Sequence, residues 1–140
     1  MTLDFLKASI GADMARVDAV LRESLSSDVV LIRQVAEYIV RGGGKRLRPA
    51  LVLLAAKACG DPAGHRHALA AVVEMIHTAT LLHDDVVDES SQRRGRATAN
   101  AAFGNAASVL VGDFLYSRAF QMMVATGRMR VLEILSDATN

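Results

Sequence analysis

The fold is decided by the stretch His77-Thr-Ala-Thr-Leu-Leu-His83-Asp84-Asp85-Val-Val-Asp88-Glu89-Ser90. It closes the longest helical stretch of the sequence, which we expect to run from His67 to about Glu89. Asp84, Asp85 and Asp88 stand near the end of this otherwise apolar helix. Because an α-helix turns by about 100° per residue, Asp84 and Asp88 should lie about 40° apart. The pattern therefore predicts a pair of carboxylates on one helix face.

Two carboxylates at this spacing repel each other, and a bound cation would remove that repulsion. Carboxylate oxygens select hard cations, so Mg²⁺ is the favoured ion. The alternative is a set of solvated acidic residues at a helix C-terminus, although acids there oppose the helix dipole. Zinc is less favoured, because His77 and His83 are six residues apart and do not share a face.

Alanine and leucine, with 23 and 16 residues, dominate the composition, and both favour helix. No stretch alternates with period two over a strand's length, so the predicted fold class is all-α. Ser26, Ser27 and Asp28 are expected to end the first helix and cap the second. Residues 90–95 are polar and are expected to form a loop. The expected helices cover 3–25, 29–40, about 49–58, 67–89, 97–103, 106–125 and 128–138.

Length and composition exclude several classes of protein. The chain has 140 residues, a net charge of +1 and a single cysteine, Cys59, which excludes an internal disulfide framework. The longest unbroken apolar run, residues 50–56, is far shorter than the roughly 20 residues of a membrane span. We therefore expect no integral membrane segment, and the cysteine usage fits a reducing cytoplasm.

Two basic clusters accompany the acidic motif. The first is Arg41-Gly-Gly-Gly-Lys45-Arg46-Leu-Arg48, and the second is Arg93-Arg94-Gly-Arg96. Glycines and cations at a helix start favour phosphate, but the pattern is not that of a nucleotide-binding Walker A loop. Nucleic acid is also disfavoured, because aromatic residues make up only 4% of the chain and the net charge is near zero. Each cluster alone could also be an ordinary solvated surface. The two basic clusters together with the acidic motif indicate a diphosphate held by metal and arginine.

In this order, GGGKRLRP (residues 42–49), LLHDDVVDES (81–90) and RRG (93–95) resemble the amino-terminal half of trans-polyprenyl diphosphate synthases, especially the long-chain bacterial members. Class I terpene cyclases share the DDxxD pattern but lack the GGGKRLRP loop. The resemblance implies the amino-terminal portion of the isoprenoid synthase helical bundle, with residues 1–140 as a single partial domain. Family members condense isopentenyl diphosphate with an allylic diphosphate such as farnesyl diphosphate.

The resemblance also implies residue roles. In the catalytic motif, Asp84 and Asp88 would ligate Mg²⁺ on the allylic diphosphate, while Asp85 would point away from the metal. Arg93 would face the allylic diphosphate during catalysis. Without the family, His77 would be interpreted as a buried core histidine. With it, the isopentenyl diphosphate ligands would be Lys45, Arg48, His77 and Arg94.

Ala79 and Thr80 occupy the family's chain-length positions, and both are small, which implies a long product, estimated as octaprenyl, for a quinone side chain. The helix over 106–125 would contribute to a homodimer interface. Complete members are about twice as long and carry a second aspartate-rich motif, so this chain is expected to be a fragment that is inactive alone. A non-catalytic subunit of a heteromeric prenyl synthase and a phosphate-binding module with an unrelated ligand remain as alternatives.

Overall fold

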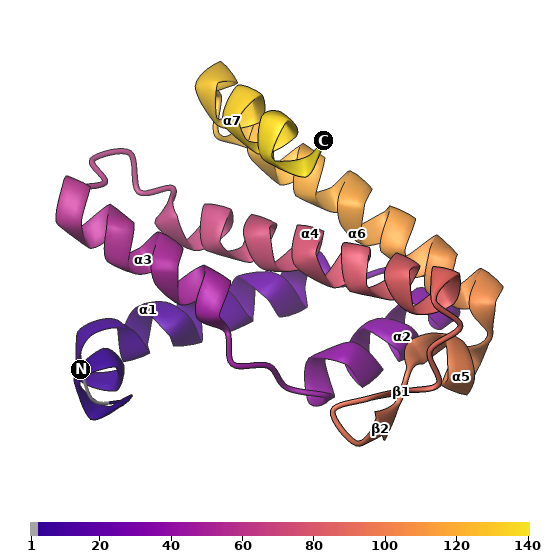
Figure 1. Ribbon diagram of the computed structural model, residues 1–140. Coiled ribbons are helices and arrows are strands. Elements are labelled where there is room, and N and C mark those ends of the chain that lie inside the picture. The colour runs from indigo at the N-terminus through magenta and orange to yellow at the C-terminus, as the bar shows by residue number, and fades with distance from the viewer. Residues whose placement is uncertain (1–2) are drawn as a thin grey trace.

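A long helix, α4 (Arg66–Val87), runs through the middle of the computed structural model, which describes residues 3–140 (Figure 1). It packs most extensively against α6, and also against α3 and α1. Its apolar residues face these neighbours, whereas its acidic end lies beside the hairpin. The other elements are α1 (Leu3–Ser24), α2 (Val30–Arg41), α3 (Leu47–Cys59), β1 (Gln92–Arg93), β2 (Arg96–Ala97), α5 (Ala99–Phe103), α6 (Asn105–Ala125) and α7 (Met129–Thr139).

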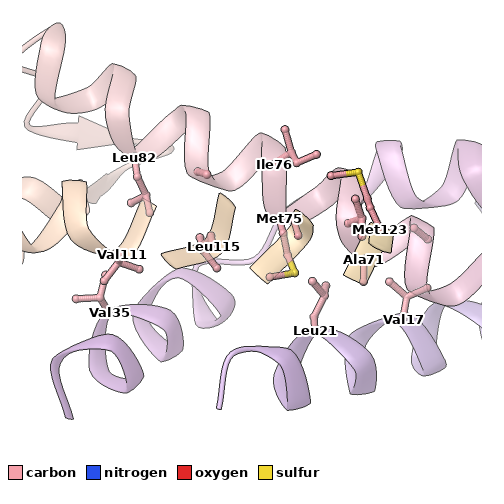
Figure 2. Packing of buried hydrophobic residues seen from close by; sticks show 14 of the residues in the cluster. Val17, Leu21, Val35, Ala71, Met75, Ile76, Leu82, Val111, Leu115 and Met123 are labelled. Carbon is pink, nitrogen blue, oxygen red and sulfur yellow. The ribbon is translucent and has the colours of Figure 1, made fainter. Parts of the chain in front are cut away.

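The core lies where α1, α2 and α6 meet α4. In Figure 2, Val111 of α6 lies between Leu82 of α4 and Val35 of α2. Met75 on α4 and Leu21 on α1 extend the same cluster along the bundle, and both side chains are buried. Burial of such side chains stabilises the fold by about 1.5–3 kcal/mol each. The core therefore fixes the position of α4 along most of its length. The face of α4 that does not pack against its neighbours is held in one orientation.

The structure confirms the predicted all-α class and corrects two local predictions. The N-cap of α2 is Val29, and no side chain caps this helix. Ser27 was expected to cap it, but its hydroxyl oxygen accepts from the Val29 backbone N–H at 3.2 Å, before the helix begins. Ser27 thus stands two residues before the N-cap position, too early to reach the donors of the first turn.

The second correction concerns residues 90–95, which were predicted to be a loop. Gln92–Arg93 and Arg96–Ala97 form a short antiparallel hairpin. Arg94 and Gly95 make its two-residue turn with φ of 52° and 75°, the positive values that a type I′ turn requires. Strands of two residues are too short for an alternating pattern to show, and the hairpin was therefore missed.

Within residues 3–140 no helix combines the length and the apolar character needed to cross a lipid bilayer.

Candidate active site

The cations of the glycine-rich loop between α2 and α3 differ in their partners. Arg46, the N-cap of α3, adopts the left-handed conformation with φ 50° and ψ 34°. Its Nη1 donates to Glu74 Oε1 at 2.7 Å, and its Nε lies 3.6 Å from Asp18 Oδ1. Lys45 and Arg48, by contrast, are exposed and form no ion pair in the described part of the chain. Two cations of the loop are therefore free to meet an external anion.

A cleft of about 280 Å³ opens beside this loop. Its walls are the loop itself, one face of α4 and the β1–β2 hairpin. The cleft brings together the five residues that were predicted to bind substrate, although they lie up to 49 positions apart in the sequence. The predicted substrate-binding residues that line it are Lys45, Arg48, His77, Arg93 and Arg94.

His77 lies on α4 in the wall of the cleft and is half-buried. Burial lowers the pKa of its imidazole, and the positive charge of Arg48 lowers it further, against the opposing effect of Glu74. The ordinary pKa is 6.5, so the ring is mainly neutral at pH 7. A neutral imidazole can donate one hydrogen bond to a phosphate oxygen without carrying a full charge.

Asp85 and Arg93 form a two-pronged ion pair between α4 and β1. Arg93 Nη2 donates to Asp85 Oδ1 at 2.7 Å, and Arg93 Nε donates to Asp85 Oδ2 at 3.1 Å. Asp85 is only 5% exposed. These hydrogen bonds and the carboxylate charge raise the pKa of Arg93 above its ordinary value, so it stays charged. Asp85 is thus buried in the wall of the cleft and paired with Arg93.

Asp84 and Asp88 lie outside the cleft, on the exposed face of α4. Neither forms an ion pair within residues 3–140. The backbone N–H of Asp88 donates to the Asp84 carbonyl at 2.8 Å, so helical geometry continues through the motif. Two exposed carboxylates on adjacent turns fit a hard divalent cation that takes its other ligands from water or phosphate. No group of three His, Cys, Asp or Glu side chains in the described residues could enclose a metal by itself.

The hairpin arginines also make contacts that sequence reasoning missed. Arg94 Nη1 donates to the Gly43 carbonyl at 3.0 Å, so it ties the hairpin to the glycine loop. The Arg96 guanidinium lies over the Tyr38 ring at 4.7 Å, and Tyr38 Oη donates to the Ala97 carbonyl. The aromatic residue in α2 offered no signal of this role, because its partner is 58 positions away.

The two predicted chain-length residues face different surroundings. Ala79 is fully buried in the core cluster. Thr80 is exposed, and its hydroxyl donates to the His77 carbonyl at 2.8 Å. The structure therefore places only Thr80 on the open side of α4, about 40° from Asp84 by helical geometry.

Comparison with known proteins identifies the family of the chain. The family model described as "Polyprenyl synthetase" matches residues 29–140. The chain belongs to the polyprenyl synthetase family. It is 59% identical to the octaprenyl diphosphate synthase of Escherichia coli over 140 residues, which are 100% of this chain and 43% of that protein. The chain thus spans less than half the length of this polyprenyl synthetase.

Solved polyprenyl synthetases share the fold. A decaprenyl diphosphate synthase from Rhodobacter capsulatus matches with a TM-score of 0.91 and 53% identity, covering 97% of this chain and 42% of that one. A polyprenyl synthase from Caulobacter crescentus, solved with calcium and isoprenyl diphosphate, matches with a TM-score of 0.93 and 50% identity, covering 99% and 42%. The expected amino-terminal portion of the isoprenoid synthase bundle is therefore confirmed.

Proposed function

We propose that this chain forms one wall of an active site that condenses isopentenyl diphosphate with an allylic diphosphate. One observation carries the proposal: a single cleft collects Lys45, Arg48, His77, Arg93 and Arg94 beside two exposed carboxylates that have no ion-pair partner within residues 3–140. The family to which the chain belongs supports the same assignment.

The cleft would hold isopentenyl diphosphate. Lys45, Arg48 and Arg94 supply positive charge, and each guanidinium can bind phosphate through two N–H groups. Arg94 would exchange its hydrogen bond with the Gly43 carbonyl for one with a phosphate oxygen. His77, mainly neutral, would add an uncharged donor. Holding this second substrate in one orientation contributes to the rate, because its double bond must face the allylic carbon.

The allylic diphosphate would lie over the exposed face of α4. Asp84 and Asp88 would hold Mg²⁺, since their oxygens are accessible and have no cation partner within residues 3–140. When bound, Mg²⁺ supplies positive charge that favours departure of the diphosphate. Arg93, fixed by Asp85, would present its remaining N–H groups to the same leaving group.

In the reaction, the allylic C–O bond breaks, and its electron pair leaves with the diphosphate. The double bond of isopentenyl diphosphate then forms the new C–C bond, and a proton is lost to give the lengthened allylic product. The released diphosphate can accept that proton, so no side-chain base is required in this half of the site. Arg93, held in place by Asp85, would stabilise the negative charge that develops on the leaving group.

We further propose a long product made from farnesyl diphosphate in the cytoplasm, with octaprenyl diphosphate as the estimate and a quinone side chain such as that of ubiquinone as its destination. The small side chains of Ala79 and Thr80 support a long product, because neither fills space below the aspartates. The name of the E. coli relative supports the octaprenyl length.

The outer face of α6 supports a homodimer. Val109, Leu110 and Val124 on this helix are 38%, 58% and 62% exposed. Exposed apolar side chains along one helix are a common feature of protein interfaces. We propose a second copy of the chain as the occupant, and Leu110→Arg should then convert a dimer to a monomer in analytical ultracentrifugation.

Calorimetric titration of the chain with isopentenyl diphosphate, without divalent metal, tests the substrate assignment. Lys45→Ala should weaken binding about tenfold or more. Arg41→Ala is the matched control, because Arg41 is exposed and lies outside the cleft, and it should leave the affinity nearly unchanged. Equal affinity in the Lys45→Ala variant and the wild type would contradict the assignment. With farnesyl diphosphate and Mg²⁺ added, this chain alone should make no product.

A further inference from the structure

The basic loop contains one cation, Arg46, that is paired with protein carboxylates. Lys45 and Arg48 are exposed, whereas Arg46 directs its guanidinium at Glu74 on α4 and Asp18 on α1. The Glu74 side chain is only 10% exposed. A buried carboxylate needs a partner, and Arg46 Nη1 at 2.7 Å is the ion-pair partner that the described residues supply.

The backbone at Arg46 is strained, because a residue with a Cβ rarely adopts a φ of 50°. Such a conformation persists only where surrounding contacts enforce it. Here the guanidinium is held from two helices, and α3 begins at the next residue, Leu47. The contacts of Arg46 therefore set both the start of α3 and the direction of the residues on either side.

Arg46 and Glu74 both border the cleft, where the negative charge of Glu74 would oppose an incoming anion. Arg46 compensates that charge and, in doing so, commits its own guanidinium to protein carboxylates. Arg46 Nη1 and Nε are directed at Glu74 and Asp18, so a diphosphate would meet a guanidinium whose charge is already compensated. Arg46 is thus held by protein carboxylates, whereas Lys45 and Arg48 have no ion-pair partner within residues 3–140.

We propose that Arg46 and Glu74 are positioning residues for the diphosphate of the second substrate. Their ion pair holds the loop so that Lys45 and Arg48 face the cleft, and neither Arg46 nor Glu74 contacts the ligand. This inference rests on the proposed function of the cleft and adds the residues that make its basic loop competent. The ion pair acts by orienting the side chains of Lys45 and Arg48 and not by binding the ligand through its own charges.

The double variant Arg46→Met/Glu74→Met tests the inference, because it removes the tether without changing the net charge. Replacing both partners of a buried ion pair with apolar side chains of similar volume commonly preserves the fold. Affinity for isopentenyl diphosphate should fall at least about tenfold, as measured by calorimetry without divalent metal. Circular dichroism should show unchanged helix content. The matched control, Glu37→Gln/Arg41→Gln, removes an exposed i,i+4 pair on α2 and should bind as the wild type does.

Wild-type affinity in the folded double variant would overturn the inference. If the double variant does not fold, Arg46→Lys replaces it, since it keeps the charge and loses the planar guanidinium. A drop of about fivefold or more would then support the inference, and an unchanged affinity would overturn it. The Lys45→Ala variant distinguishes failure of the proposed function from failure of the positioning role. If this variant binds isopentenyl diphosphate normally, the proposed function fails. If it binds weakly while the tether variants bind normally, only the positioning role fails.

Discussion

Arg93 donates two hydrogen bonds to Asp85, one of 2.7 Å from Nη2 to Oδ1 and one of 3.1 Å from Nε to Oδ2. This pair gives the three aspartates of the motif different environments. Asp85 is buried and bonded to an arginine, while Asp84 and Asp88 are exposed. The helix thus uses one carboxylate to hold an arginine in place and leaves two for a metal.

The stability of the chain should depend on Asp85 and not on Asp84. Asp85→Ala removes both hydrogen bonds of a charged pair, and we expect it to lower the free energy of unfolding by about 1–3 kcal/mol. Asp84→Ala is the matched control on the adjacent position. It removes a repulsion from Asp88 and should stay within about 0.5 kcal/mol of the wild type. Urea denaturation of the two variants measures the difference, and equal losses would disprove the separate roles.

The ring of His77 should titrate below its ordinary pKa of 6.5, because burial and then Arg48 disfavour the charged form. With a folded pKa below the unfolded one, its contribution to stability is present above pH 6.5 and is lost as the pH falls through the folded pKa. A diphosphate in the cleft should raise the pKa again by favouring the imidazolium. NMR titration, with His77→Gln to assign the signal, measures both values. A free-chain pKa above 6.5 is the contrary result.

A second pH dependence should arise far from the cleft, where α1 meets α4. Asp13 Oδ1 lies 2.7 Å from His67 Nε2 and 3.3 Å from Arg66 Nε. The hydrogen bond with His67, aided by Arg66, lowers the pKa of Asp13 below its ordinary 3.8. This contribution to stability is present above pH 3.8 and is lost as the pH falls through the folded pKa.

Asp13→Asn should therefore cost about 1–3 kcal/mol at pH 7, and the difference from the wild type should shrink in acid. Thermal unfolding at several pH values measures that trend. Asp28→Asn, at an exposed position without an ion pair in residues 3–140, provides the control. A difference that stays constant down to pH 3 would show that the Asp13 contacts do not depend on its charge.

Product length offers a further test in a complete enzyme. Thr80→Phe should shorten the product, because Thr80 lies on the open side of α4 near Asp84. Ala79→Phe should shorten it as well. However, Ala79 is fully buried, so a phenylalanine there also costs about 1–3 kcal/mol of stability. Mass analysis of the products, with folding checked by circular dichroism, gives the answer. Unchanged length in both variants would refute the chain-length role of these two positions.

The helices and the motif could be predicted from the sequence, because long apolar periodicity and the spacing of Asp84 and Asp88 are local features. The ion pair of Arg46 with Glu74 could not, since it joins positions 28 residues apart and depends on a left-handed backbone. The β1–β2 hairpin was missed because each strand has only two residues. Ala79 is buried and Thr80 is exposed, and the sequence of two adjacent small residues does not show which of them faces the core.

We expect this chain to supply functional diphosphate-binding residues to the active site of a polyprenyl synthetase. The most direct measurement fuses residues 1–140 to the remaining carboxy-terminal part of the E. coli octaprenyl diphosphate synthase, which the chain matches at 59% identity. With Mg²⁺, farnesyl diphosphate and labelled isopentenyl diphosphate, the chimera should make a long polyprenyl diphosphate. Lys45→Ala and Asp84→Ala should each reduce the rate at least about 100-fold. A folded chimera without activity, or one that both substitutions leave active, would contradict the account.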